Sequence, residues 1–307
     1  MTDIATHAGP ESAKGSEGET AAEDSGAPSA DLQDWIGRLF VFRDTADLRR
    51  ATALQATLET PEEPLAEGDA LPELWHWAYF WEIASQSGVS SDGHAARGRF
   101  LPPIELPRRM WAGSRLTWLR PIRIGLELTK QSEVVAIEQK EGRSGRLAFV
   151  TLRHIVSDPA GPLLEEEHDI VYREAAAAGE GWRPGAPSER EAVWSREIQP
   201  DPLLLFRYSA LTFNGHRIHY DRPYATDVEG YPGLIVHGPL LATCMVDLAR
   251  REAPDRRIAA FRFRALAPVF DTAPFVVCGA PDETGAELWV EGPDRRLCMQ
   301  GRVEWGD

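Results

Sequence analysis

The sequence has no apolar stretch of membrane-spanning length and very few cysteines. Its longest hydrophobic runs fall well short of the roughly 20 residues that a membrane helix needs. The three cysteines, Cys244, Cys278 and Cys298, form no Cys-x-x-Cys pair and lie in apolar surroundings. This pattern is typical of reduced core thiols. The N-terminus also lacks the basic-then-apolar order of a signal peptide. We therefore expect a cytoplasmic protein with no membrane partner.

Positive charge is scarce as well. The formal net charge is −15, which argues against a nucleic-acid partner. No phosphate-binding glycine motif follows a predicted strand, so no nucleotide cofactor is indicated. The eight histidines do not pair with carboxylates at metal-ligand spacing. We expect neither a metal nor a cofactor.

The chain divides into a tail and two halves. Residues 1–31 are rich in Gly, Ser, Ala and Glu without an apolar period, which predicts a disordered tail. Residues 32–175 form the predicted N-terminal domain, with a strand at 39–42 and a helix at 46–58. Its four further strands are expected at 110–119, 126–139, 146–157 and 165–173. Residues 176–200, rich in Ala, Gly and Pro, read as a linker.

The C-terminal domain, residues 201–307, repeats this order of elements. A strand is predicted at 203–208 and a largely apolar helix at 240–251. Four strands follow, at 258–266, 274–279, 287–291 and 296–304. One helix wrapped by an antiparallel sheet is a hot-dog unit, so the chain is predicted to be α+β with a double hot-dog fold.

A polar loop in the second half carries the clearest chemical signal. His216, His219 and Asp221 follow the aromatic run at 206–213, and Gly238 stands at the entrance of the predicted helix. A histidine on a loop beside a glycine at a helix start suits proton transfer next to a developing oxyanion. Ordinary loop polar residues and a helix cap are the alternative interpretation.

This loop resembles the signature of the MaoC-like (R)-specific hydratases. The matching residues run from Ser209 to Asp221 and continue in Val236-His237-Gly238. Longer phrases, such as Asp34-Trp-Ile-Gly-Arg, Leu71-Pro-Glu-Leu-Trp-His-Trp and Asp92-Gly-His94, are similar to the mesaconyl-C4-CoA and itaconyl-CoA hydratases. The resemblance implies a hydro-lyase that reversibly converts mesaconyl-C4-CoA to citramalyl-CoA. The substrate would bring the CoA, and no other cofactor would be needed.

The resemblance also implies roles for individual residues. His219 would be the general base, with His216 as its competitor, and the backbone N–H of Gly238 would stabilise the thioester oxygen. Asn214 stands where the family carries an Asp, five positions before the histidine. An amide cannot transfer a proton, so Asn214 would orient water, and Asp221 is a candidate acid if it is not a turn or helix cap.

The first half lacks this loop, so we expect it to shape the acyl pocket. A free carboxylate on the acyl group would call for an arginine. Arg97, Arg108, Arg109 and Arg217 are candidates, and the sequence does not choose among them. His94, Val236 and His237 are further predicted substrate contacts. A 3-hydroxyacyl-thioester dehydratase of fatty-acid synthesis and a non-catalytic acyl-CoA-binding protein are the alternatives. A homodimer stays open.

Overall fold

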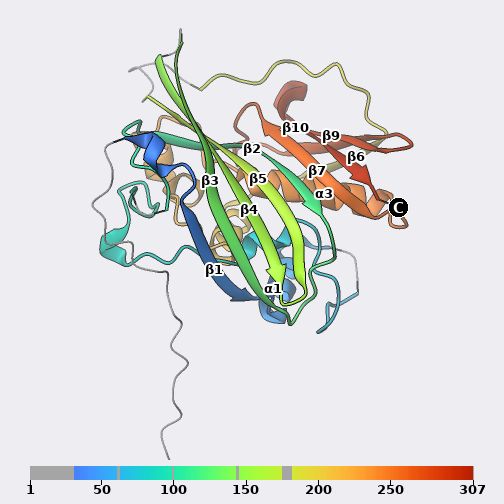
Figure 1. Cartoon of the computed structure of the whole chain (residues 1–307). Coiled ribbons are helices and arrows are strands. Elements are labelled where there is room, and N and C mark those ends of the chain that lie inside the picture. The colour runs from blue at the N-terminus through green and yellow to red at the C-terminus, as the bar shows by residue number, and fades with distance from the viewer. Residues whose placement is uncertain (1–30, 61–62, 99, 143–144, 175–181, 307) are drawn as a thin grey trace, which may run out of the picture.

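The computed structural model describes residues 31–60, 63–98, 100–142, 145–174 and 182–306 (Figure 1). The predicted disordered tail lies almost wholly outside the described residues. No helix in the described part of the chain is long and apolar enough to span a bilayer. The longer helices are α1 (Leu48–Leu58), α2 (Pro202–Leu211) and α3 (Gly238–Glu252).

Ten antiparallel strands form one continuous sheet in the order β1-β3-β4-β5-β2-β7-β10-β9-β8-β6. The strands of the first half are β1 (Leu39–Thr45), β2 (Arg108–Trp118), β3 (Glu127–Gly142), β4 (Gly145–Asp158) and β5 (Gly161–Arg173). Those of the second half are β6 (Trp194–Ile198), β7 (Ile258–Ala265), β8 (Phe275–Pro281), β9 (Gly285–Gly292) and β10 (Arg296–Trp305).

Each half has the same internal strand order. The first half reads β1-β3-β4-β5-β2, and the second reads β6-β8-β9-β10-β7 from its own outer edge. In chain order, each half has a helix between its first two strands: α1 lies between β1 and β2, and α3 lies between β6 and β7. The predicted double hot-dog fold is confirmed. The halves join where β2 pairs with β7, from Gly113 opposite Arg264 to Thr117 opposite Ala260.

The helix α3 fills the second half. Ten consecutive residues, 240–249, are buried, which is expected for a helix covered by a curved sheet on one side and by loops on the other. It contacts the neighbouring strands β8, β9 and β10, and Figure 1 shows it lying across that end of the sheet. The helix therefore has a fixed place, and its first residue, Gly238, is held with it.

Two predicted features of the second half were wrong. The segment predicted as a strand at 203–208 is the helix α2, because Asp201 caps it by accepting the N–H of Leu204 at 2.7 Å and Pro202 suits its first turn. The segment called a linker contains β6, which pairs with β8 and supplies the outer strand. The proposed domain limits themselves stay a prediction.

The interior of the first half contains a buried polar cluster. The Glu166 carboxylate accepts hydrogen bonds from Ser114 Oγ at 2.9 Å, Trp77 Nε1 at 3.2 Å and His76 Nε2 at 3.3 Å. Burial by itself would raise the pKa of Glu166, but the His76 hydrogen bond and nearby histidines hold it at about 2. The cluster therefore keeps a carboxylate ionised inside the N-terminal half.

Candidate active site

His219 lies on a short 3-10 turn, Arg217–His219, in the loop between α2 and α3. Its Nδ1 is 2.7 Å from the carbonyl oxygen of Ile235. A carbonyl can only accept, so Nδ1 carries the proton of the neutral ring and Nε2 keeps a lone pair. Burial lowers the pKa of His219 to about 4. The ring is therefore a neutral base at neutral pH.

His237 packs against this ring, and Val236 lies just before His237 in the chain. The His237 ring stacks on His219 with centroids 3.7 Å apart, and its Nε2 lies 2.8 Å from Ser209 Oγ. Val236 is buried and donates its N–H to the Val269 carbonyl at 2.8 Å. Both residues were predicted to contact substrate. In the structure the His237 ring packs against His219, and Val236 is buried in the core.

Gly238 begins α3 directly after this pair. A Cβ placed on Gly238 would meet only Met299 Cε, at 4.0 Å, so packing within the protein does not require glycine here. The first N–H groups of a helix have no intrahelical acceptor and carry a partial positive charge. The helix start thus offers a donor and open space for an oxygen that gains negative charge.

Asn214 shapes the loop between α2 and His219. Its Oδ1 accepts the backbone N–H of His216 at 3.0 Å, and its own N–H donates to Ser209 O at 2.8 Å. Among the described residues, the side-chain nitrogen Nδ2 of Asn214 forms no hydrogen bond. Asn214 therefore fixes the turn and keeps a side-chain donor.

A loop of the first half is hydrogen-bonded to the loop that carries His219. The backbone N–H of Arg217 donates to Asp92 O at 2.9 Å, and Arg217 Nη1 donates to Ser91 O at 3.0 Å. Gly93 lies directly against Gly215: a Cβ on Gly93 would be 1.9 Å from the Gly215 oxygen. Sequence reasoning picked out the Asp92-Gly-His94 phrase but could not show that its glycine is the point of contact.

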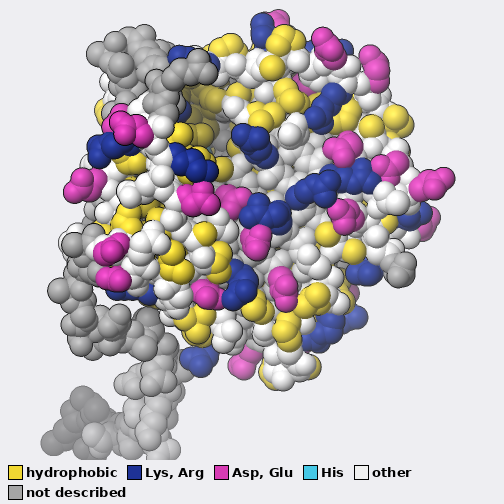
Figure 2. All heavy atoms as spheres, turned by 45° about the horizontal axis from the view of Figure 1, so that its top comes forward, with side chains coloured by type: hydrophobic (Ala, Val, Ile, Leu, Met, Phe, Trp, Pro, Cys, Tyr) yellow, Lys and Arg dark blue, Asp and Glu magenta, His cyan; other side chains and the backbone are white. Residues whose placement is uncertain are grey.

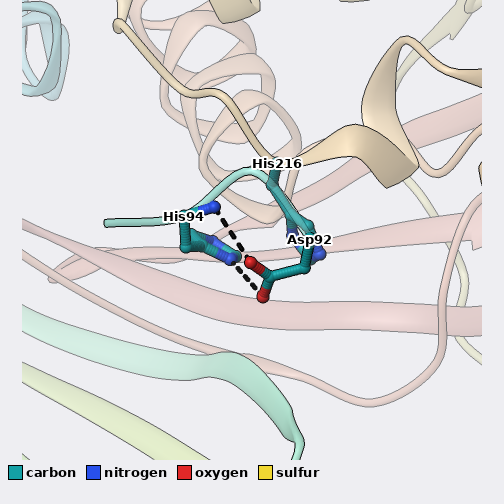
Figure 3. Close-up of side chains that lie close together, drawn as sticks. All are labelled: Asp92, His94 and His216. Atoms are coloured by element: carbon teal, nitrogen blue, oxygen red, sulfur yellow. Dashed lines mark hydrogen bonds and ion pairs between the residues drawn. The ribbon is translucent and has the colours of Figure 1, made fainter. Parts of the chain in front are cut away.

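Asp92 and His94 thereby reach the histidines of the second half (Figure 3). His94 Nδ1 is 3.0 Å from Asp92 Oδ2, and the His94 ring centroid is 4.1 Å from that of His216, which is 5.4 Å from that of His219. Burial lowers the pKa of His94 and lowers that of His216 to about 2. Three rings from two halves thus form one neutral array.

Asp92, His94 and His216 are the only possible metal-ligand set found in the described part of the chain. Donor atoms of Asp92, His94 and His216 lie within 4.8 Å of one another. A divalent cation requires several such donor atoms close together, but Asp92 and His94 are hydrogen-bonded to each other in this structure. The expected absence of a metal stays a prediction.

Asp221 is tied up in structural contacts. Its Oδ2 accepts from Arg217 Nε at 2.9 Å and Nη2 at 2.7 Å, and its Oδ1 accepts the Tyr224 N–H at 3.2 Å. The Arg217 hydrogen bonds lower the pKa of Asp221. A carboxylate held in this way favours the capping interpretation over the acid, and it also occupies Arg217.

A cavity of about 370 Å³ opens beside His94. The first half provides its walls, which include Asp92, His94, Arg97 and Arg109. On the face shown in Figure 2, basic and acidic side chains are interspersed. The candidate site thus has its base and helix start in the second half and its adjoining cavity in the first.

The chain is similar to several known proteins over most of its length. Residues 74–271 match the family "Hydroxyacyl-thioester dehydratase type 2". The chain is 48% identical to the mesaconyl-C(4)-CoA hydratase of Chloroflexus aurantiacus, over 91% of this chain and 99% of that protein. It is 29% identical to the mitochondrial hydroxyacyl-thioester dehydratase type 2 of Schizosaccharomyces pombe, over 71% and 79%.

A Mycobacterium tuberculosis structure described as a double hotdog fold aligns with a TM-score of 0.53 at 15% identity, covering 88% of this chain and 96% of that one. At that identity the likeness concerns the fold alone. The extended sequence match and the hot-dog architecture lead to the same assignment. The chain belongs to the hydroxyacyl-thioester dehydratase type 2 family and is a hydro-lyase with the double hot-dog fold.

Proposed function

We propose that the protein hydrates a short branched dicarboxylyl-CoA, mesaconyl-C4-CoA, to citramalyl-CoA. The observation that carries the proposal is the neutral His219, whose free Nε2 lies in the loop before a helix start that has room for a thioester oxygen. The 48% identity to a mesaconyl-C(4)-CoA hydratase supports the choice of acyl group.

The reaction adds water across a double bond conjugated to the thioester. His219 Nε2 takes a proton from water while the water oxygen bonds to the β-carbon, and the π electrons move onto the thioester oxygen. The Gly238 N–H and the α3 dipole stabilise that oxygen, and one such donor is worth roughly 3–4 kcal/mol. The imidazolium then returns the proton to the α-carbon. The Asn214 amide nitrogen orients the water, so no carboxylic acid is required.

Two observations bear on the alternatives. A fatty-acid dehydratase needs an apolar channel for its acyl chain, whereas the first half encloses the Glu166 cluster. A non-catalytic binding protein would not need a neutral base whose tautomer is fixed by Ile235. The three cysteines are free and buried, which supports the cytoplasmic location that we also propose.

The direct test follows the loss of enoyl-thioester absorbance with purified protein and mesaconyl-C4-CoA, itaconyl-CoA, crotonyl-CoA or a long-chain enoyl-CoA. We expect mesaconyl-C4-CoA to have the highest kcat/KM. Preference for the long chain would favour the fatty-acid role. Turnover of none of them, together with unaltered ligand binding in His219→Ala, would favour the non-catalytic role.

A further inference from the structure

We infer that Arg109 is the receptor for the free carboxylate of the acyl group, and thus the residue that selects dicarboxylyl over monocarboxylyl thioesters. The inference rests on the proposed function and extends it to a residue of the first half. It follows from which arginines already have partners, from what surrounds Arg109, and from where the carboxylate lies in the substrate.

The other candidate arginines are engaged. Arg97 donates to three backbone carbonyls, those of Ile104, Leu106 and Pro107. Arg108 Nη2 lies 3.4 Å from Glu229 Oε2, and Arg217 is bidentate to Asp221. A guanidinium with its donors satisfied in this way has little left for a ligand.

Arg109 differs from all three. It lines the 370 Å³ cavity together with Asp92 and His94, and no carboxylate in the described ranges lies within ion-pair distance of it. Burial is the main cause that lowers the pKa of His94 and that of His216, and the positive charge of Arg109 lowers both pKa values further. Arg109 therefore acts electrostatically on these two histidines. Arg109 is thus a cation that lines open space beside His94, whose ring neighbours that of His216.

The hydroxyl of Tyr172 is a second donor, which lies in the core beside Arg109 and does not itself line the cavity. It is the direct cross-strand neighbour of Arg109, on β5, and it is fully buried. Its hydroxyl proton has no acceptor among the residues that the structure describes. A buried hydroxyl without an acceptor is costly. Arg109 cannot supply one, because guanidinium only donates, whereas an incoming carboxylate would accept from both.

The chemistry of the substrate requires a charge here. In mesaconyl-C4-CoA the free carboxylate is attached to the β-carbon, the atom that water attacks. The thioester oxygen points to α3 in the second half, so the carboxylate extends toward the first half. A cation beside it offsets a negative charge that would otherwise oppose the build-up of charge on the conjugated system. Arg109 thus serves both affinity and rate.

Binding of unreactive analogues tests the inference without any turnover. Succinyl-CoA carries the free carboxylate, and butyryl-CoA replaces it with a methyl group. Isothermal titration calorimetry on the full chain should give wild type a preference for succinyl-CoA on the order of 10- to 100-fold, the range for a hydrogen-bonded charge. Arg109→Gln should abolish this preference and leave butyryl-CoA binding unchanged.

Two further variants sharpen the test. Arg115→Gln removes an exposed arginine from the same strand, where it pairs with Glu167 and Asp169, and should keep the full preference. Tyr172→Phe should keep the melting temperature, because its hydroxyl has no acceptor to lose, yet weaken succinyl-CoA binding several-fold.

The outcomes separate this inference from the proposed function. Equal affinities of wild type for the two analogues, or an unchanged preference in folded Arg109→Gln, would overturn the role of Arg109. A preference that depends on Arg109, with no hydration of mesaconyl-C4-CoA, would keep the receptor and reject the proposed reaction. If Arg109→Gln hydrates mesaconyl-C4-CoA much more slowly than wild type but hydrates 3-methylcrotonyl-CoA at the wild-type rate, both the receptor role and the proposed reaction are supported.

Discussion

Replacing Gly93 by alanine should disable the enzyme by separating the two loops that build its site. The added Cβ would lie 1.9 Å from the Gly215 oxygen, whereas ordinary contact begins near 3.4 Å. The backbones must therefore part by about 1.5 Å, and neither is a flexible side chain that can swing away. Displacements of about 1 Å at reacting groups can cost on the order of 100-fold in rate.

Gly98→Ala is a matched control in the same loop. Gly93 has φ +91° and Gly98 has φ +86°, so both substitutions impose the same left-handed strain, roughly 1–2 kcal/mol. A Cβ on Gly98 would meet only Pro103 Cβ at an ordinary 3.7 Å. Thermal unfolding should show that both variants lose stability through the same backbone strain, and that Gly93→Ala loses further stability through its clash with Gly215. The hydration assay should show a large loss of kcat/KM for Gly93→Ala alone. Near-equal kcat/KM in the two variants would refute the reasoning.

Four other predictions concern three single groups, Gly238, His219 and Glu166. Gly238→Ala should keep the melting temperature but lower kcat with little change in dissociation constant, since its Cβ enters space that the protein leaves open; full activity would contradict the oxyanion role. The acid limb of kcat/KM should fall near pH 4, and not near 6.5, because burial lowers the pKa of His219 to about 4. Since that folded-state pKa is depressed, the stability gained from a neutral His219 is complete above pH 6.5 and lost as the pH falls toward 4, which denaturant titrations at several pH values would detect. Glu166→Ala should cost about 3–5 kcal/mol in urea unfolding, because it strands the donors of Ser114, Trp77 and His76, whereas Glu166→Gln keeps an acceptor and should cost clearly less.

Most strands were predictable from the sequence, and one helix was not. The alternating strands and the buried α3 follow from local periodicity, so their existence and order could be predicted. Residues 203–208 misled because Leu and Phe favour strands and helices alike over so short a run. The capping geometry of Asp201 decided the outcome. The strand β6 was missed because it is short and its burial comes from pairing with β8, a partner about 80 residues away.

The candidate residues of the site could be predicted from the sequence, but the contacts between them could not. The loop spacing and family resemblance pointed to His219, Asn214 and Gly238, whose catalytic roles stay proposals. What could not be predicted is that Asp221 is bound by Arg217 and that Gly93 meets Gly215. The Gly93–Gly215 contact joins segments more than 100 residues apart, on which no local pattern reports, and the Arg217–Asp221 pair depends on the exact turn that the loop adopts between them.

The seam between β2 and β7 sets rules for recombining relatives of this enzyme. A chimera that exchanges the first half would bring its own cavity wall while keeping the base and helix start of the recipient. Such an exchange must preserve the antiparallel register from Gly113 to Thr117 and a glycine on each side of the loop contact. A hybrid that keeps both features should inherit the acyl preference of one parent and the proton chemistry of the other. We therefore expect an exchange at this junction to transfer the substrate range together with the first half.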